Sequence, residues 1–172
     1  MSDILDQFMD HKSALAKLAA KIPGLGDFMA RNDYRAADKL LRETLAQRVE
    51  EQQRRLNEAQ QLMLEGSGLL HLDRLERVQT KLTILADSIR SASYGYAGLF
   101  AKIKIDEEEL ARIYEYDHQL FENLQEISSA FDQLEVAIDE GQGMKESISE
   151  LNRASTAALE ALRRRDEVII NR

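Results

Sequence analysis

Residues 75–103 read LERVQTKLTILADSIRSASYGYAGLFAKI, and this stretch decides the fold. Apolar residues recur in it at alternating intervals of three and four: Leu75, Val78, Leu82, Leu85, Ile89, Ala92, Tyr96, Leu99 and Ile103. This alternation is typical of the a and d positions of a coiled-coil-like helix, which form one narrow apolar seam. The stretch therefore predicts a long helix over about residues 69–104 that buries its seam against other helices.

Three other parts of the chain carry seams with similar spacing. They predict helices over about residues 33–65, 107–139 and 144–170. The first seam runs through Tyr34, Ala37, Leu41, Leu45, Val49, Gln52, Leu56, Ala59 and Met63; the second through Leu110, Ile113, Asp117, Leu120, Leu124, Ile127, Phe131, Leu134 and Ile138; the third through Met144, Ile148, Leu151, Ser155, Ala158, Leu162, Arg165 and Ile169. Four helices with such seams can bury all of them by packing together.

Polar and glycine residues mark where these helices are expected to begin and end. Asn32 or Asp33 can cap the first of them, because a short polar side chain there accepts a hydrogen bond from the first turn. The glycines in residues 66–68 and 141–143 offer the left-handed conformation that often ends a helix.

The chain has 172 residues, 44% of them apolar, which is the size of about one domain with one core. The expected fold class is all-α. Over residues 31–172 we expect an antiparallel up-down-up-down four-helix bundle with coiled-coil-like seams, since short connections place consecutive helices side by side. One alternative stays open, in which two long hairpins bury their seams only in a dimer.

Residues 1–30 form a separate N-terminal segment in this interpretation. Pro23 must end its helix, because the residue before a proline is disfavoured in the helical conformation. Gly24-Leu25-Gly26 then predicts a flexible corner. The helix is expected either to lie back on the bundle as a fifth helix or to act as an amphipathic arm for a membrane surface or a partner. The apolar residues of this arm are Ile4, Leu5, Phe8, Met9, Leu15, Leu18 and Ile22.

Two charged residues interrupt otherwise apolar seams. Asp117 breaks the seam of residues 110–138, and Arg165 breaks the seam of residues 144–169. Counted outward from the turn at Gln142, Asp117 lies level with residue 167, which brings Arg164 or Arg165 within reach. Because a buried charge is costly unless it is paired, we expect a structural Asp117–Arg165 ion pair that fixes the register of the bundle. The functional alternative is a ligand pocket formed with Tyr94, Tyr96, Tyr114 and Tyr116.

The sequence SYGYAGLF at residues 93–100 is the least helix-like part of the 75–103 seam. A glycine inside a helix costs about 1 kcal/mol relative to alanine, so another contact must offset the two here. The missing Cβ atoms would let another segment approach closely; alternatively, the stretch forms a kink or hinge that presents tyrosines to a partner. The candidates for close packing or partner contact are Tyr94, Gly95, Tyr96, Gly98 and Phe100.

Charge and motifs argue against most chemistries. The chain has no cysteine and a net charge of −8, while residues 106–140 alone carry −11, so it lacks the basic face that binds nucleic acid. Glu115 and His118 match the Glu-x-x-His pair of di-metal bundles, but both fall outside the seam and the motif has no second copy. No combination of nucleophile, histidine and acid is recognisable. We therefore expect no catalytic residue, no metal, no cofactor and no small-molecule substrate.

Three strings resemble those of uncharacterised bacterial all-helical proteins: IPGLG at 22–26, ADKLLR at 37–42 and SYGYAGLF at 93–100. This resemblance implies a bacterial, cytoplasmic helical protein and brings no activity with it. The acidic start, MSDILD, also disfavours a secretory signal peptide. We expect a non-enzymatic protein that acts by protein–protein interaction or self-association, as a scaffold, adaptor or assembly subunit. A peripheral membrane protein that uses its N-terminal helix is the alternative, and a ligand- or metal-binding bundle is a further one.

Overall fold

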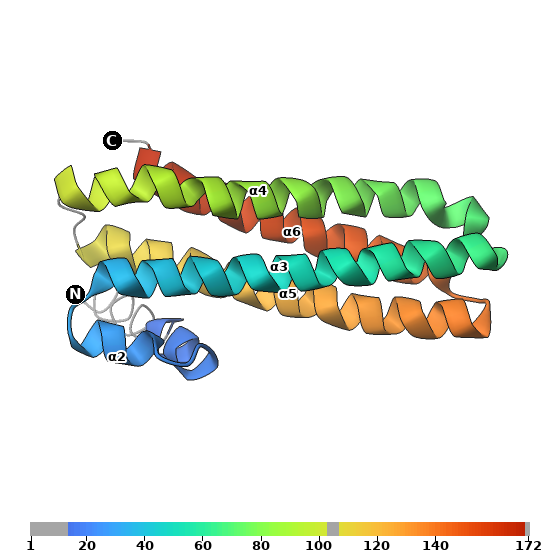
Figure 1. Cartoon of the computed structure of the whole chain (residues 1–172), viewed down its shortest axis with the longest axis horizontal. Helices are drawn as coiled ribbons and strands as arrows, with labels where there is room; N and C mark the ends of the chain where they lie inside the picture. The colour runs from blue at the N-terminus through green and yellow to red at the C-terminus, as the bar shows by residue number, and fades with distance from the viewer. Residues whose placement is uncertain (1–13, 103–106, 171–172) are drawn as a thin grey trace, which may run out of the picture.

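The computed structural model describes residues 14–102 and 107–170, and for residues 34, 92–102, 107, 110, 169 and 170 it describes the backbone alone. Four long helices lie side by side in Figure 1: α3 (Tyr34–Glu65), α4 (Leu72–Lys102), α5 (Glu107–Glu140) and α6 (Met144–Ile170). A helix over residues 14–21 and the short α2 (Leu25–Ala30) precede them. The described part of the chain contains no strand, which confirms the expected all-α class.

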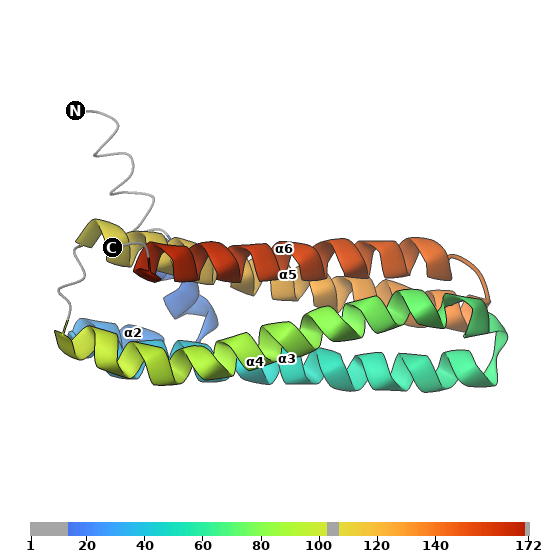
Figure 2. The same cartoon turned by 90° about the horizontal axis from the view of Figure 1, so that it is seen from above.

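The four long helices are arranged as two stacked hairpins. α3 packs on α4, and α5 packs on α6; α3 also contacts α5, and α4 contacts α6. The two views in Figures 1 and 2 place α4 and α5 at opposite corners, although they follow one another in the chain. The expectation that consecutive helices are neighbours is therefore wrong for α4 and α5. A seam identifies the buried face of a helix, but it does not identify which helices flank that face.

The expected seams form the core. On α3 each seam residue from Ala37 to Met63 is buried, including the polar Gln52. On α4 the seam residues from Leu75 to Ile89 are all buried as well. Burial of these side chains, each worth about 1.5–3 kcal/mol, drives the helices together. None of the described helices combines the length and apolarity needed to cross a membrane.

The N-terminal segment lies against the long helices wherever it is described. Its first helix ends at Lys21, before the Ile22–Pro23 bond. Leu18 and Ile22 are buried in the same core as α3–α6, and Leu15 packs against that core. These three side chains are therefore occupied within the molecule and do not face a membrane or a partner. The other arm residues, Ile4, Leu5, Phe8 and Met9, lie outside the described residues.

The corner after Pro23 is shorter than expected. Gly24 has a φ of +85° and turns the chain, and α2 then begins at once with Leu25, which is fully buried. The expected corner over residues 24–26 is therefore limited to Gly24, since Leu25 and Gly26 belong to α2 and Leu25 anchors the segment in the core. α2 packs on α3, so residues 14–30 form a layer on the outside of the long helices.

The helix ends follow the expected chemistry in part. Asp33 caps α3, and its carboxylate accepts a hydrogen bond from the Ala36 N–H at 3.2 Å. Gly141 and Gly143 adopt the left-handed conformation, with φ of +71° and +81°. Gly66 does not: its φ is −120°, and residues 67–71 then form the short 3-10 helix η1 (Ser67–His71). The expectation of a left-handed cap there was wrong, and α4 begins at residue 72 rather than 69.

Gly68 is required for the close approach of η1 to α3. A Cβ atom at this position would lie 2.7 Å from both Cβ and Cγ of Met63 and 3.1 Å from its Cα. We expect Gly68→Ala to lower the free energy of unfolding by about 1–3 kcal/mol, because the buried Met63 leaves no room for it. Gly66→Ala is the matched control, since a Cβ there meets only the Leu62 carbonyl oxygen, at 3.4 Å. Urea unfolding of both variants measures the difference. Equal stabilities of the two variants would contradict the close approach of η1 to α3.

Candidate functional site

Four charged side chains meet inside the helices and form what we call the polar layer: Asp38, Arg42, Asp117 and Arg165. Asp117 and Arg165 are 1% and 2% exposed, and Asp38 is 7% exposed. Asp38 and Arg42 lie one turn apart on α3, Asp117 lies on α5, and Arg165 lies on α6. The layer therefore draws on three of the four long helices and on both hairpins.

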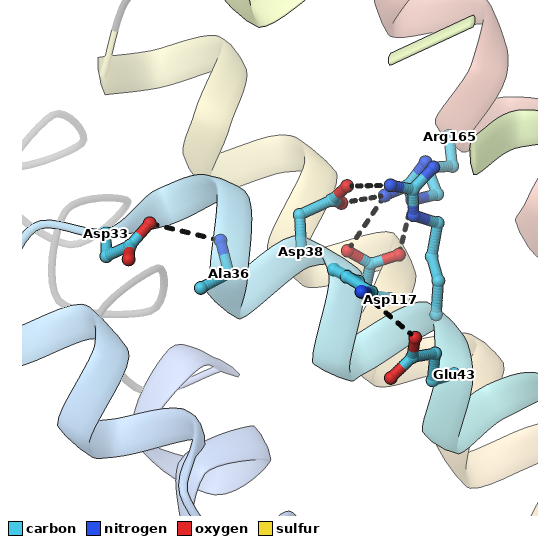
Figure 3. A network of polar contacts seen from close by, with 8 residues as sticks. Asp33, Ala36, Asp38, Glu43, Asp117 and Arg165 are labelled. Carbon is cyan, nitrogen blue, oxygen red and sulfur yellow. Dashed lines mark hydrogen bonds and ion pairs between the residues drawn. The ribbon is translucent and has the colours of Figure 1, made fainter. Parts of the chain in front are cut away.

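Arg165 is the centre of the layer (Figure 3). Its Nε donates a hydrogen bond to Oδ1 of Asp117. Its Nη2 donates to Oδ2 of Asp117 at 3.4 Å and to Oδ1 of Asp38 at 3.2 Å. Oδ2 of Asp38 in turn pairs with Nη2 of Arg42 at 2.7 Å. Two carboxylates and two guanidinium groups thus alternate, and their formal charges cancel.

Burial dominates the electrostatics of Asp117. It raises the pKa of this carboxyl from its ordinary value of 3.8 to about 6. The charge and hydrogen bond of Arg165 and the charge of Arg42 oppose the rise, whereas Asp38 adds to it. The loss of water around the carboxylate therefore outweighs its attraction to Arg165. Because a solute in the surrounding water does not reach Asp117, this arrangement suits the joining of helices better than acid–base chemistry on a substrate.

The structure brings Asp117 and Arg165 together, whereas Arg164 points elsewhere. Arg164 is exposed, and its Nε donates a hydrogen bond to Glu160 on its own helix at 3.1 Å. Its inclusion in the polar layer was wrong, because residues adjacent in a helix point about 100° apart and only one of them can follow the seam.

Sequence reasoning missed Asp38 and Arg42. A signal for them exists in the first half of the α3 seam, where the residues Ala37, Leu41 and Leu45 recur every four positions. Steps of four exceed the 3.6-residue helical turn, so the buried stripe drifts around the helix and widens. Asp38 follows a seam residue directly and has Arg42 four positions later, which is the spacing of an intrahelical ion pair.

Of the four tyrosines proposed to form a ligand pocket, Tyr114 and Tyr116 are among the described side chains. Tyr114 is buried in the core of the long helices, and Tyr116 is half-buried. Two positions apart on one helix, these side chains diverge by about 200° and do not line one pocket. The other candidates of this region lie in α4, where the structure describes only the backbone: Tyr94, Gly95, Tyr96, Gly98 and Phe100.

The Glu115-x-x-His118 pair lies outside the core. Glu115 is exposed, and His118 Nε2 lies 3.6 Å from Oε1 of Glu122, one turn along α5. Within residues 14–102 and 107–170, no three histidine, aspartate or glutamate side chains gather in a way that could hold a metal ion.

Comparison with known proteins identifies no family for this chain. No protein-family model, no curated protein and no solved structure matches the chain. The function must therefore be argued from the surfaces and buried groups of the chain itself.

Proposed function

We propose that this protein is a non-enzymatic, cytoplasmic helical bundle that acts by protein–protein interaction, as a scaffold or assembly subunit. In this proposal successive helices of α3–α6 run up, down, up and down, and two antiparallel hairpins with coiled-coil-like seams stack to form the bundle. Two features support a structural role. The charged groups of the core pair with one another, and the described part of α5 presents a strongly acidic outer face that suits a solvated surface.

Four exposed leucines at one end of the molecule carry the proposal. Leu62, Leu64, Leu69 and Leu70 are 47%, 59%, 59% and 88% exposed. They lie where α3 passes through η1 into α4, at the right-hand end of the molecule in Figure 1. We call these four leucines the leucine tip. Leu62 and Leu64 point to different sides of α3, so the tip surrounds the end of the molecule. The summed exposed area of the four side chains is on the order of 400 Å², and exposed apolar groups gathered at one end of a protein are commonly interaction sites.

A second copy of the chain is the partner that suits the leucine tip. The chain as a whole carries −8, so two copies repel one another over most of their surfaces. Across residues 62–70 the only charged side chain is Glu65, so two tips can meet with little repulsion. Two tips would bury at most roughly 800 Å², which is below the 1,200 Å² of a stable interface, and the contact is therefore expected to be weak and concentration-dependent.

The oligomeric state tests this proposal. We expect the weight-average mass of the full chain to rise with concentration in sedimentation experiments over a hundredfold range. Leu69→Glu/Leu70→Glu should abolish the rise, because it places four carboxylates where two tips meet, while leaving the core untouched. Ile84→Glu is the matched control, since Ile84 on α4 is 49% exposed and lies away from the tip. A mass that stays monomeric throughout, or a rise that survives the double substitution, would contradict self-association through the tip.

A further inference from the structure

A groove runs between α4 and α6, which pack side by side. Arg74 and Arg77 on α4 line it, together with Ile148, Ser149 and Asn152 on α6, and its volume is about 270 Å³. Ile148 is buried in the core and forms the floor. The groove is smaller than most small-molecule sites, which begin at about 300 Å³, so it suits a side chain of a partner better than a free ligand.

Three cations follow one another along this groove: Arg74, Arg77 and Lys81, which we call the basic strip. Their spacing of three and four residues places them on one face of α4, over a length of about 10 Å. Lys81 Nζ donates hydrogen bonds to Oδ1 of Asn152 and Oγ1 of Thr156 on α6, both at 2.7 Å. Both partners are neutral, so the charge of Lys81 is held in place without being compensated.

The two arginines of the basic strip are exposed, and neither forms an ion pair within the part of the chain that the structure describes. Asp73 and Glu76, the acids next to them in the sequence, do not pair with them. Arginines on other faces differ: Arg55, Arg90 and Arg153 each pair with an acid on a neighbouring helix. Like charges three or four residues apart destabilise a helix, so the strip opposes folding of the free chain, and an anionic partner would remove this effect.

We propose that the basic strip binds an acidic helix of a partner protein, whose glutamates or aspartates recur every three or four residues along one face. The Cβ atoms of neighbouring acids on such a helix are about 5–6 Å apart, which matches the spacing of the cations along α4. The partner helix lies along the α4–α6 groove, and one of its carboxylates enters the groove between Arg74 and Arg77, where the Ser149 hydroxyl donates to it. This inference rests on the proposed role in protein–protein interaction, and it is independent of self-association through the leucine tip.

The size of the basic strip favours a helix over other polyanions. Clusters that hold a protein on an anionic membrane contain about four to eight basic residues, and nucleic acid binding draws on a wider basic face. Both kinds of surface are also repelled by a chain of net charge −8. A single helix, about 10 Å wide, contacts the strip without approaching the strongly acidic α5, which lies at the corner opposite α4.

Fluorescence anisotropy with two isomeric peptides tests the proposal on the full chain. Both are alanine-based peptides of about 20 residues, long enough to form helices, and both contain the same number of glutamates. In one peptide the glutamates share one face, at intervals of three and four residues; in the other they are spread around the helix. We expect the one-face peptide to bind at least tenfold more tightly at low ionic strength, and its binding to weaken as salt is added.

Two double variants locate the binding surface. Arg74→Glu/Arg77→Glu should weaken binding of the one-face peptide at least tenfold. Arg35→Glu/Arg54→Glu is the matched control, since it changes the net charge by the same amount at two exposed arginines of α3, and it should leave the affinity nearly unchanged.

Several results would overturn the proposal. Equal binding of the two peptides, or an equal loss in the two double variants, would show that the peptides respond to net charge alone. Flotation of the natural chain with phosphatidylserine vesicles that Arg74→Glu/Arg77→Glu abolishes would assign the basic strip to a membrane surface instead. Binding of neither peptide would also overturn it. Because the peptides contain no leucine, a chain that binds neither of them but self-associates in sedimentation would keep the proposed function and lose only this inference.

Discussion

Arg165→Met is expected to lower the free energy of unfolding at pH 7 by about 3–5 kcal/mol. Arg165 donates hydrogen bonds to both Asp117 and Asp38, and all three side chains are buried. Without the guanidinium group, Asp38 keeps its contact with Arg42, but Asp117 loses the cation that faces it. A carboxylate left unpaired in the core then opposes folding. Urea unfolding followed by circular dichroism measures the loss.

Two further variants identify the cause of this loss. Arg164→Met changes the exposed neighbour of Arg165, and its free energy of unfolding is expected to stay within about 0.5 kcal/mol of the natural value. The double variant Arg165→Met/Asp117→Leu should recover most of the stability, because no unpaired charge remains beside the new apolar pair. If Arg165→Met lowers the free energy of unfolding no more than Arg164→Met does, the polar layer does not hold the helices together.

The polar layer explains how two similar hairpins can pack in one register. Apolar seams tolerate a shift of one turn, since leucine then meets leucine again. Arg165 instead reaches from α6 to Asp38 on α3, which lies at the opposite corner of the four helices. A shift by one turn moves Asp38 about 5 Å along α3 and leaves the charges unpaired. We therefore expect the layer to select one register, a role that polar seam residues have in coiled coils.

The sequence predicted what depends on a single helix. The seams of α3 and α4 follow from spacing alone, because a residue on the apolar face of a long helix is buried whichever partner covers it. The cap at Asp33 and the left-handed glycines at 141 and 143 are also local, and they were found from residue type. The Asp117–Arg165 contact could be found because each residue breaks a seam and the turn between α5 and α6 is short.

Features that depend on the packing of two or more helices could not be predicted from the sequence in the same way. α3 packs beside α5 rather than α6, and the apolar seams of α5 and α6 do not indicate which of the two is its neighbour. Asp38 lies beside the α3 seam, and its burial depends on how Arg165 enters from another helix. Gly68 looks like an ordinary turn residue, although its role is the close approach to Met63, which only the packed structure defines.

The pH dependence of stability should reveal the charge on Asp117. Burial raises the pKa of this carboxyl in the folded protein from 3.8 to about 6, so the folded state binds the proton more tightly than the unfolded state does. The stabilisation from this proton is fully present below about pH 4 and is lost as the pH rises through about 6. A rise in pKa of this size corresponds to a change of about 3 kcal/mol in the free energy of unfolding.

Asp117→Asn isolates this contribution, because the amide keeps an acceptor oxygen for Arg165 Nε and cannot titrate. Relative to the natural chain, the variant should gain roughly 2–2.5 kcal/mol in free energy of unfolding between pH 4 and pH 7. Other groups act in the opposite sense, since the pKa of Glu122 is lowered by its hydrogen bond with Lys21 and that of His118 is lowered by burial. They are common to both proteins, and their effects cancel in the difference. In the Arg165→Met background the same comparison should give a larger gain at higher pH, because the cation that opposes the rise in pKa is gone. A difference that does not change with pH would show that Asp117 keeps its ordinary pKa, because the attraction of Arg165 then fully offsets the loss of water.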